Sequence, residues 1–201
     1  MKIILVRHGQ TDWNLEQRLQ GSVDIPLNET GRSQAYELRE KIKNINFSIC
    51  YSSDLFRAAE TAQIITGHRD SDAEPICYIR YDKRLRERSF GNFEGRKSSE
   101  FDFDFFVDKS WDMELNLSDY GFEPIRDVYR RIKDFCDDAL EKARIEFGDD
   151  AVILIAAHGG VSRVLNYVLL GGGENPDKNS EAWQKTRDFQ LHNCEMVEYN
   201  I

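Results

Sequence analysis

Two short, uninterrupted runs of apolar residues, at positions 3–6 and 151–157, constrain the fold of this chain more than any other feature of its sequence. Neither run alternates with polar residues as a half-buried strand would. Each therefore predicts a strand buried on both faces, as in parallel sheets that helices cover on each side. Weaker strand patterns cover residues 48–51 and 76–81, and residues 190–199 are expected to close the sheet.

Helical patterns fill the intervals between these strands. The first helix can begin at a cap on Asn28 or Thr30 and runs through about Ile42. Three more helices are predicted over residues 55–66, 124–146 and 161–170. Strands that alternate with helices predict the α/β class, with a mostly parallel central sheet and helices on both faces. The chain length of 201 residues fits a single domain, residues 1–201.

Residues 97–120 fit neither the helical nor the strand period. Five aromatic side chains are interleaved there with acidic ones: Phe101, Phe103, Phe105, Phe106 and Trp111. One interpretation is a helical excursion whose aromatic side chains pack onto the domain. The other is a cap-like insertion that covers a substrate site, since irregular insertions often carry specificity.

The net charge of −9 argues against one broad class of partner. With 27 Lys and Arg against 36 Asp and Glu, the surface repels nucleic acid and anionic membranes. No apolar run approaches the roughly 20 residues that span a bilayer. The first residues also turn polar too soon for a signal peptide, so a cytoplasmic location is expected. A small anionic substrate would need positive charge that is gathered locally.

Two of the four histidines share a local context. His8 follows the first apolar run after one residue, Arg7, and precedes Gly9, and His158 directly follows the second run and precedes Gly159. Ligands bind beyond the carboxyl ends of strands in open α/β sheets. Either histidine alone is more typical of a structural residue, but a pair at two strand ends is harder to explain by packing. Glycine beside each histidine is expected to let a ligand approach the backbone closely.

Arginine residues strengthen this interpretation. Arg7 precedes His8, and Arg57 follows the strand pattern that ends near residue 51. A guanidinium group offers a planar fork that meets two phosphate oxygens at once. Two such groups beside two imidazoles would make a cationic pocket on an acidic protein. The same arginine would repel a metal cation from His8, and the four cysteines form no CxxC pair, so neither a metal nor another cofactor is expected.

Four segments together resemble the motifs of the histidine phosphatase superfamily, whose members include cofactor-dependent phosphoglycerate mutases. The first segment, residues 7–14, reads Arg-His-Gly-Gln-Thr-Asp-Trp-Asn. The others are residues 52–62, 85–95 and 157–160, and all four occur in the family's order. The resemblance implies a phosphoglycerate mutase-like fold and transfer of a phosphoryl group through a phosphohistidine.

The resemblance also implies a role for each matching residue. His8 would be the nucleophile, and Glu87 would protonate the leaving alkoxide and then activate water. Arg7, Arg57 and His158 would hold the phosphate oxygens. The two arginines would supply positive charge there, with protonated His158 as a further candidate. Four further residues would complete the pocket, the last two at its rim: Asn14, Gly159 through its backbone, Gln20 and Gly21.

The same pocket could release phosphate to water or return it to a second hydroxyl. The mutase branch carries a lysine shortly after the third motif, where this chain has Ser98, and an arginine pair in the following insertion, where this chain is acidic and aromatic. These departures favour the phosphatase branch, with mutase-type transfer as the alternative. The family's Gly-Glu-Ser is also altered here, to the Gly-Phe-Glu-Pro of residues 121–124, which leaves any substrate role of Glu123 open.

The expected partner is a small phosphorylated metabolite. Sugar phosphates, a nucleoside-like phosphate from cobamide assembly and phosphoglycerate all remain candidates. A third possibility is a non-catalytic module that only binds phosphorylated ligands, although such relatives usually lose one of the four central residues. The oligomeric state is left open between a monomer and a homodimer.

Overall fold

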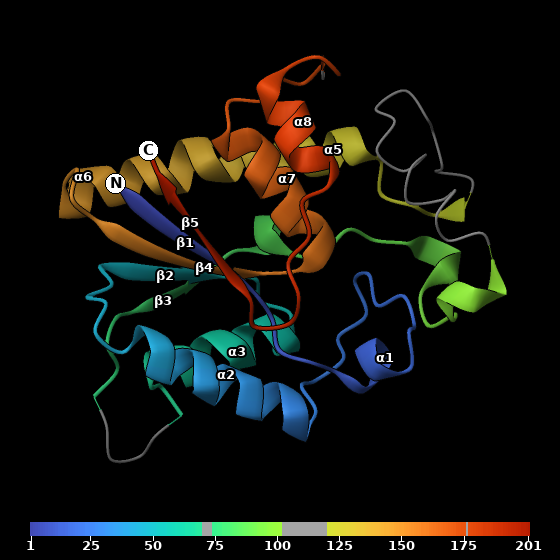
Figure 1. Cartoon of the computed structure of the whole chain (residues 1–201), viewed down its shortest axis with the longest axis horizontal. Coiled ribbons are helices and arrows are strands. Elements are labelled where there is room, and N and C mark those ends of the chain that lie inside the picture. The colour runs from blue at the N-terminus through green and yellow to red at the C-terminus, as the bar shows by residue number, and fades with distance from the viewer. Residues whose placement is uncertain (70–73, 102–119, 176) are drawn as a thin grey trace.

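The computed structural model describes residues 1–69, 74–101, 120–175 and 177–201, and within them five strands pair into one sheet (Figure 1). Their order across the sheet is β3-β2-β4-β1-β5. The strands are β1 (Lys2–Arg7), β2 (Ile49–Ser52), β3 (Ile79–Tyr81), β4 (Val152–Ala157) and β5 (Met196–Asn200). Strands β1 to β4 run parallel, and β5 runs antiparallel to β1 at one edge.

The two apolar runs of the sequence form the adjacent central strands β1 and β4. Their register sets Ile4 opposite Leu154 and Arg7 opposite Ala157. Alternate side chains of both strands enter two separate hydrophobic cores, one on each face of the sheet. Burial on both faces explains why neither strand alternates with polar residues.

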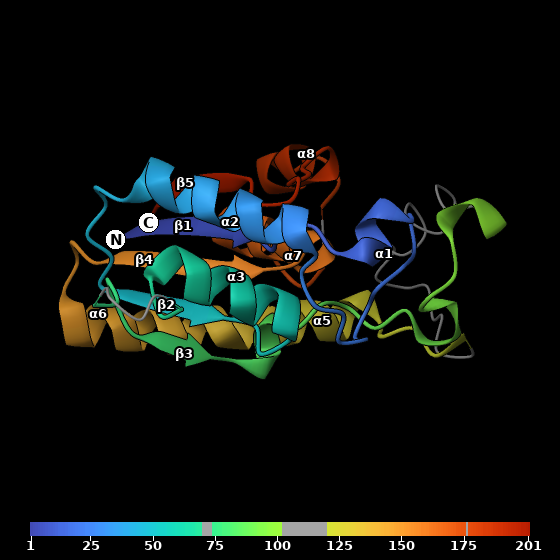
Figure 2. The ribbon, with the colours of Figure 1, turned by 90° about the horizontal axis from the view of Figure 1, so that it is seen from below.

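Helices cover both faces of the sheet, as Figures 1 and 2 show from two directions. Helices α2 (Glu29–Ile42) and α3 (Phe56–Thr66) lie on one face. On the other face lie α5 (Ile125–Phe135), α6 (Glu141–Phe147) and α7 (Gly159–Leu169), with α8 (Glu181–Arg187) packed against α7. The α/β class with a mostly parallel sheet between helical layers is therefore confirmed.

The helix signals in the sequence mostly match the observed boundaries. Asn28 caps α2, and its side-chain oxygen accepts a hydrogen bond from the backbone N–H of Gly31 at 2.9 Å. The helix expected over residues 124–146 is divided by a π-helical turn, Cys136–Leu140, between α5 and α6. At this turn the buried Tyr51 hydroxyl donates to the backbone carbonyl of Ala139 at 2.9 Å.

Several segments differ from the expectations or lie outside them. The sequence did not predict the one-turn helix α1 (Asp12–Leu15) or helix α8, and β3 and β5 are shorter than the patterns over residues 76–81 and 190–199. Most of the proposed insertion over residues 97–120 lies outside the described residues, which end at 101 and resume at 120. Among the described helices, none combines the length and apolar character that a bilayer crossing requires.

Candidate active site

The pairing of β1 with β4 brings His8 and His158 together beyond the carboxyl ends of the strands. His8 follows β1 directly, and its backbone N–H donates to the carbonyl of Ala157, the last residue of β4, at 3.0 Å. His158 follows β4 and is the N-cap of α7. The two imidazole rings lie 5.2 Å apart between centroids, and both are buried. Helix α1 lies beyond the same ends of the strands (Figure 1).

The hydrogen bonding of His8 determines which ring nitrogen carries its proton. The Nδ1 atom lies 2.7 Å from the carbonyl oxygen of Gly9. Because a carbonyl oxygen only accepts, Nδ1 carries the hydrogen and Nε2 keeps its lone pair. Burial lowers the pKa of His8 well below its usual range, and the nearby charges of Arg57 and Arg7 lower it further. The ring is therefore neutral at neutral pH, with Nε2 unprotonated.

His158 has the opposite arrangement of donors and acceptors. The Nε–H of Arg57 donates to His158 Nδ1 at 3.2 Å, so the ring hydrogen lies on Nε2, which is 2.8 Å from the hydroxyl oxygen of Ser53. Burial lowers the pKa of His158 well below its usual range, with further lowering by Arg57 and His8. In this arrangement His158 is neutral. The positive charge beside it belongs to Arg57.

Arg57 is a fully buried cation held by neutral acceptors. Besides the bond to His158, its guanidinium donates to the carbonyl oxygens of Val23 at 2.7 Å and Gly21 at 2.8 Å. Burial lowers the pKa of Arg57 to about 10, against the raising effect of Glu87. The group remains charged at neutral pH. Gly21 therefore lies beside the cluster as an acceptor for Arg57.

Two groups near the cluster have unused hydrogen-bonding capacity. Arg7 donates from Nη1 to the carbonyl of Leu191 at 2.8 Å, while its buried Nε has no hydrogen-bond partner among the described residues. Burial lowers the pKa of Arg7. Gln20 is buried, and its Oε1 likewise lacks a partner in the part of the chain that the structure describes. A phosphate oxygen or a substrate hydroxyl would supply the missing partners.

Glu87 reaches the cluster from the segment that follows the 3-10 turn Lys83–Leu85. Its carboxylate accepts from the backbone N–H groups of Gly160 at 3.0 Å and Val161 at 3.1 Å, at the N-terminus of α7, and from that of Arg88 at 3.0 Å. The N–H groups of a first helical turn have no acceptor within the helix, and the helix dipole favours negative charge there. These bonds fix the carboxylate beside the N-cap residue His158.

Asn14 lies in α1 and contacts a residue that the sequence did not single out. The Asn14 Oδ1 atom accepts from the backbone N–H and the hydroxyl of Thr11, both at 3.1 Å, and from Nδ2 of Asn193 at 3.3 Å. Asn193 Nδ2 also donates to the carbonyl oxygen of His8 at 2.9 Å. Three donors at Oδ1 fix the orientation of the Asn14 amide, so that Nδ2 is the side left for a ligand.

The glycines beside the two histidines make room for other parts of the protein. A Cβ on Gly9 would lie 2.4 Å from the carbonyl oxygen of Gly31, so glycine lets the loop after β1 touch the start of α2. A Cβ on Gly160 would lie 2.8 Å from Oε1 of Glu87. Gly9 and Gly160 therefore leave room for contacts within the protein, while the close approach of a ligand beside Gly9 and Gly159 stays a prediction. A Cβ on Gly159 would meet the Arg7 guanidinium at 3.4 Å, an ordinary contact.

The cluster therefore brings together seven of the residues proposed from the sequence: Arg7, His8, Gly21, Arg57, Glu87, His158 and Asn14 through Asn193. Reasoning from the sequence missed Ser53 and Asn193. Ser53 lies within the second motif, which is a signal that could have found it. No local pattern marks Asn193, which reaches His8 from 185 residues further along the chain. Within the described ranges, no three His, Cys, Asp or Glu side chains gather as a metal site.

The chain is similar to several known proteins in sequence and in fold. The sequence model of the histidine phosphatase superfamily (branch 1) matches residues 3–200. The chain is 34% identical over 195 residues to fructose-2,6-bisphosphatase TIGAR of Xenopus tropicalis, covering 94% of this chain and 67% of that protein. It is also 34% identical over 171 residues to phosphoglycerate mutase-like protein 4 of Arabidopsis thaliana, covering 82% and 69%. A mycobacterial glucosyl-3-phosphoglycerate phosphatase in complex with VO3 superposes with a TM-score of 0.74 at 26% identity, covering 98% of this chain and 91% of that one.

Proposed function

Since the chain belongs to the histidine phosphatase superfamily, branch 1, and is an enzyme of its phosphatase or mutase type, we propose that it hydrolyses phosphate monoesters of small metabolites through a phosphohistidine on His8. The observation that carries the proposal is the state of the His8 ring. The Gly9 carbonyl engages Nδ1, and burial beside two guanidinium groups keeps the ring neutral. Nε2 is then a nucleophile with an available lone pair at neutral pH.

The phosphate would be bound by donors that already surround His8. Arg7 offers its buried Nε–H, and Asn14 offers Nδ2 because its oxygen is engaged. The backbone N–H of Gly159 begins α7, where the first N–H groups have no acceptor within the helix. Arg57 adds a second positive charge beside His158. Together these groups would stabilise the charge on the phosphate oxygens in the transition state.

The first half of the reaction transfers the phosphoryl group to the protein. Nε2 of His8 attacks phosphorus, a P–N bond forms, and the bond from phosphorus to the ester oxygen breaks. Glu87 acts as the general acid and gives a proton to the departing alkoxide, which leaves as an alcohol. The charge that the phosphorylated imidazole gains is offset by the negative phosphoryl oxygens.

The second half returns the protein to its starting state. Glu87, now a carboxylate, takes a proton from a water molecule as the water oxygen attacks phosphorus. The P–N bond breaks, inorganic phosphate leaves, and Nε2 recovers its lone pair. The carboxyl group acts first as an acid and then as a base, so the catalyst is unchanged over one turnover.

The proposed mechanism uses no metal ion. In phosphoryl transfer the protein or a metal must neutralise the charge that spreads over the phosphoryl oxygens. Here the partly buried Arg7 and the fully buried Arg57 would do so, in surroundings of low dielectric constant where a charge has a larger effect. Their positive charge would also disfavour a cation at His8.

The contacts of Arg96 favour hydrolysis over mutase-type transfer. A mutase needs extra positive charge for the second anionic group of its bisphosphorylated intermediate. Arg96, which follows the third motif, stacks over the rings of Phe93 and Phe101, at 5.0 Å and 5.5 Å from their centroids. Its Nε lies 3.4 Å from a carboxylate oxygen of Glu100. These contacts direct the guanidinium toward its own segment instead of a second anion.

The direct experiment measures hydrolysis of p-nitrophenyl phosphate by the protein and by His8→Ala, each with and without EDTA. We expect activity that persists in EDTA and is lost in His8→Ala. Substantial turnover by His8→Ala would contradict the nucleophile assignment. Complete loss in EDTA with recovery on addition of magnesium would replace the mechanism with a metal-assisted one.

A substrate panel would then separate hydrolysis from transfer. It should include sugar phosphates, fructose 2,6-bisphosphate and glucosyl-3-phosphoglycerate, since a relative and a structural neighbour carry the corresponding names. It should also include 3-phosphoglycerate with its bisphosphate primer. Release of inorganic phosphate supports the phosphatase, whereas formation of 2-phosphoglycerate without phosphate release supports the mutase.

A further inference from the structure

The backbone that carries Glu87 has little regular structure of its own. The 3-10 turn Lys83–Leu85 ends two residues before it, and residues 86–89 lie in no helix or strand. A segment of this kind has few internal hydrogen bonds to fix its path. The position of the Glu87 carboxylate therefore depends on groups from elsewhere that hold the backbone on each side of it.

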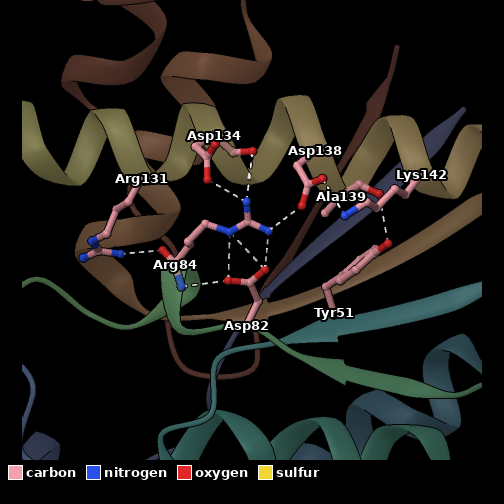
Figure 3. Close-up of polar contacts among 8 residues, drawn as sticks. All are labelled: Tyr51, Asp82, Arg84, Arg131, Asp134, Asp138, Ala139 and Lys142. Atoms are coloured by element: carbon pink, nitrogen blue, oxygen red, sulfur yellow. Dashed lines mark hydrogen bonds and ion pairs between the residues drawn. The ribbon is translucent and has the colours of Figure 1, made fainter.

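Arg131, on helix α5, holds the backbone before Glu87. Its Nη1 donates to the carbonyl oxygens of Arg84 at 2.5 Å and Arg86 at 2.8 Å. Figure 3 shows this guanidinium beside Arg84, with the contact to the Arg84 carbonyl as a dashed line. One cation thus bonds two carbonyl groups that lie three residues and one residue before Glu87.

Glu123, which precedes α5, holds both Arg131 and the backbone after Glu87. Its two carboxylate oxygens accept from Nε of Arg131 at 2.7 Å and from Nη2 at 3.0 Å, a bidentate pair. One of these oxygens also accepts from the backbone N–H of Ser89 at 3.3 Å, and the Glu123 carbonyl accepts from Nε of Arg88 at 2.6 Å. The pair of Arg131 and Glu123 therefore contacts the chain on both sides of Glu87.

A second set of contacts ties the start of the segment to the same helical layer. The guanidinium of Arg84 bonds Asp82, Asp134 and Asp138, at 2.6 Å, 2.7 Å and 3.0 Å (Figure 3). Asp134 lies in α5, and Asp138 lies in the π-helical turn that follows. These contacts fix Arg84, and a bidentate pair of Arg86 with Asp54, both bonds 2.6 Å, holds the side chain next to Glu87. Arg131 and Glu123 hold the backbone itself on both sides of Glu87.

We propose that Arg131, held by Glu123, is a positioning residue for Glu87, an inference that rests on the acid–base role given to Glu87 in the proposed function. The bidentate pair orients the Arg131 fork, and the fork fixes the backbone from which the Glu87 side chain extends. Only about a fifth of the Arg131 side chain is exposed, 19%, so water competes weakly for these bonds. In this proposal Glu123 has a structural role and does not contact the substrate.

The test compares two esters that differ in their need for a general acid. An alkyl phosphate has a poor leaving group and needs the proton, whereas p-nitrophenyl phosphate needs it little. Misplacing a catalytic group by about 1 Å costs on the order of 100-fold in rate. For Arg131→Met we therefore expect the rate of the phosphoryl-transfer step, measured as alcohol released from the alkyl phosphate in a single turnover, to fall roughly 100-fold. The single-turnover release of p-nitrophenol, which needs little help from the acid, should fall much less.

Two further variants sharpen the comparison. Arg131→Lys keeps the charge but lacks the fork that reaches two carbonyl groups and Glu123 at once, so it should show the same selective loss, only smaller. Arg130→Met is the matched control. Arg130 lies next to Arg131 on α5, but its side chain is 60% exposed and pairs with Glu174. Its removal changes the charge equally and should leave the ratio of the two activities unchanged.

The double variant Glu87→Gln with Arg131→Met separates positioning from general support of the fold. If Arg131 acts through Glu87, the double variant loses no more alkyl phosphate activity than Glu87→Gln alone, because residues that act as a unit are not additive. Equal losses on both esters in Arg131→Met and Arg131→Lys, or multiplying losses in the double variant, would overturn the proposal. Should Glu87→Gln itself fail to distinguish the esters, the acid role would fall and the positioning role with it. The loss of phosphatase activity in His8→Ala tests the nucleophile assignment separately, whatever the outcome for Glu87 and Arg131.

Discussion

Replacing Gly160 by alanine tests how closely Glu87 must approach helix α7. The added Cβ would lie 2.8 Å from Oε1 of Glu87, whereas ordinary contact begins at 3.4 Å. The oxygen must therefore retreat by about 0.6 Å. That movement lengthens its hydrogen bond to the N–H of Val161, now 3.1 Å, beyond the usual range. The carboxylate would then be weakly held and displaced from its catalytic position.

The magnitude follows from these distances. Since a 1 Å misplacement costs about 100-fold, a displacement of roughly 0.6 Å should lower kcat for an alkyl phosphate about tenfold. Loss of a hydrogen bond to a charged group costs about 1.5–3 kcal/mol, and alanine recovers up to about 1 kcal/mol of helix propensity relative to glycine. The variant should therefore be about 1 kcal/mol less stable, a decrease in Tm of about 2–4 °C.

The assay pairs steady-state kinetics on the two esters with thermal unfolding. Gly173→Ala is the control, because a Cβ at that position meets nothing within 4 Å. We expect Gly160→Ala to lose alkyl phosphate activity selectively while remaining folded. Unchanged kcat for the alkyl phosphate would refute the reasoning that Glu87 is held by its contact with the start of α7.

Two other predictions concern stability. The pKa values of His8 and His158 are lowered in the folded protein, so below the usual value of about 6.5 the unfolded chain binds protons that the folded chain does not. The free energy of unfolding should therefore fall as pH drops below about 6.5, by up to about 2.7 kcal/mol per pH unit when both rings contribute. In His8→Gln, where one ring remains, the slope should be about half as large. Equal slopes of unfolding free energy against pH in the original protein and in His8→Gln would contradict this. Tyr51→Phe removes the buried bond to Ala139 and should cost about 1 kcal/mol, seen as a lower Tm with unchanged kcat. A changed kcat would instead link the π-helical turn to catalysis.

The fold was largely predictable because its main signals are local. The apolar runs that became β1 and β4, and the cap at Asn28, depend only on neighbouring residues. Helix α1 was not predicted because four residues are too few to show the helical repeat of apolar side chains, even though Thr11 and Asn14 form a reciprocal cap. The π-helical turn also escaped, since nothing in the spacing of apolar residues over 124–146 marks it.

The candidate site was predictable in its members but only partly in its contacts. The adjacency of His8 and His158 follows once β1 and β4 are neighbours, which the pattern of buried strands suggests. The placement of the ring hydrogen of His158 depends on Arg57 and Ser53, whose bonds to it span more than 100 residues of chain. Bonds of that separation leave no local pattern in a single sequence.

The pair formed by Arg131 and Glu123 was missed for the same reason. In the sequence Arg131 is one of two adjacent arginines on a helix, and Glu123 stands in an altered motif. Only the packing of α5 against the segment before Glu87 gives either residue a role. Its detection required three-dimensional contacts.

The most direct test of the central claim is to identify the phosphorylated residue. The protein is mixed with p-nitrophenyl phosphate and quenched in alkali within a single turnover, since phosphohistidine is stable there and phosphoserine is not stabilised in the same way. The peptide that contains His8 is then examined by mass spectrometry. The account predicts one phosphoryl group on His8, absent after acid treatment. Phosphate on another residue, or full turnover with no phosphoprotein at any time before steady state, would contradict it.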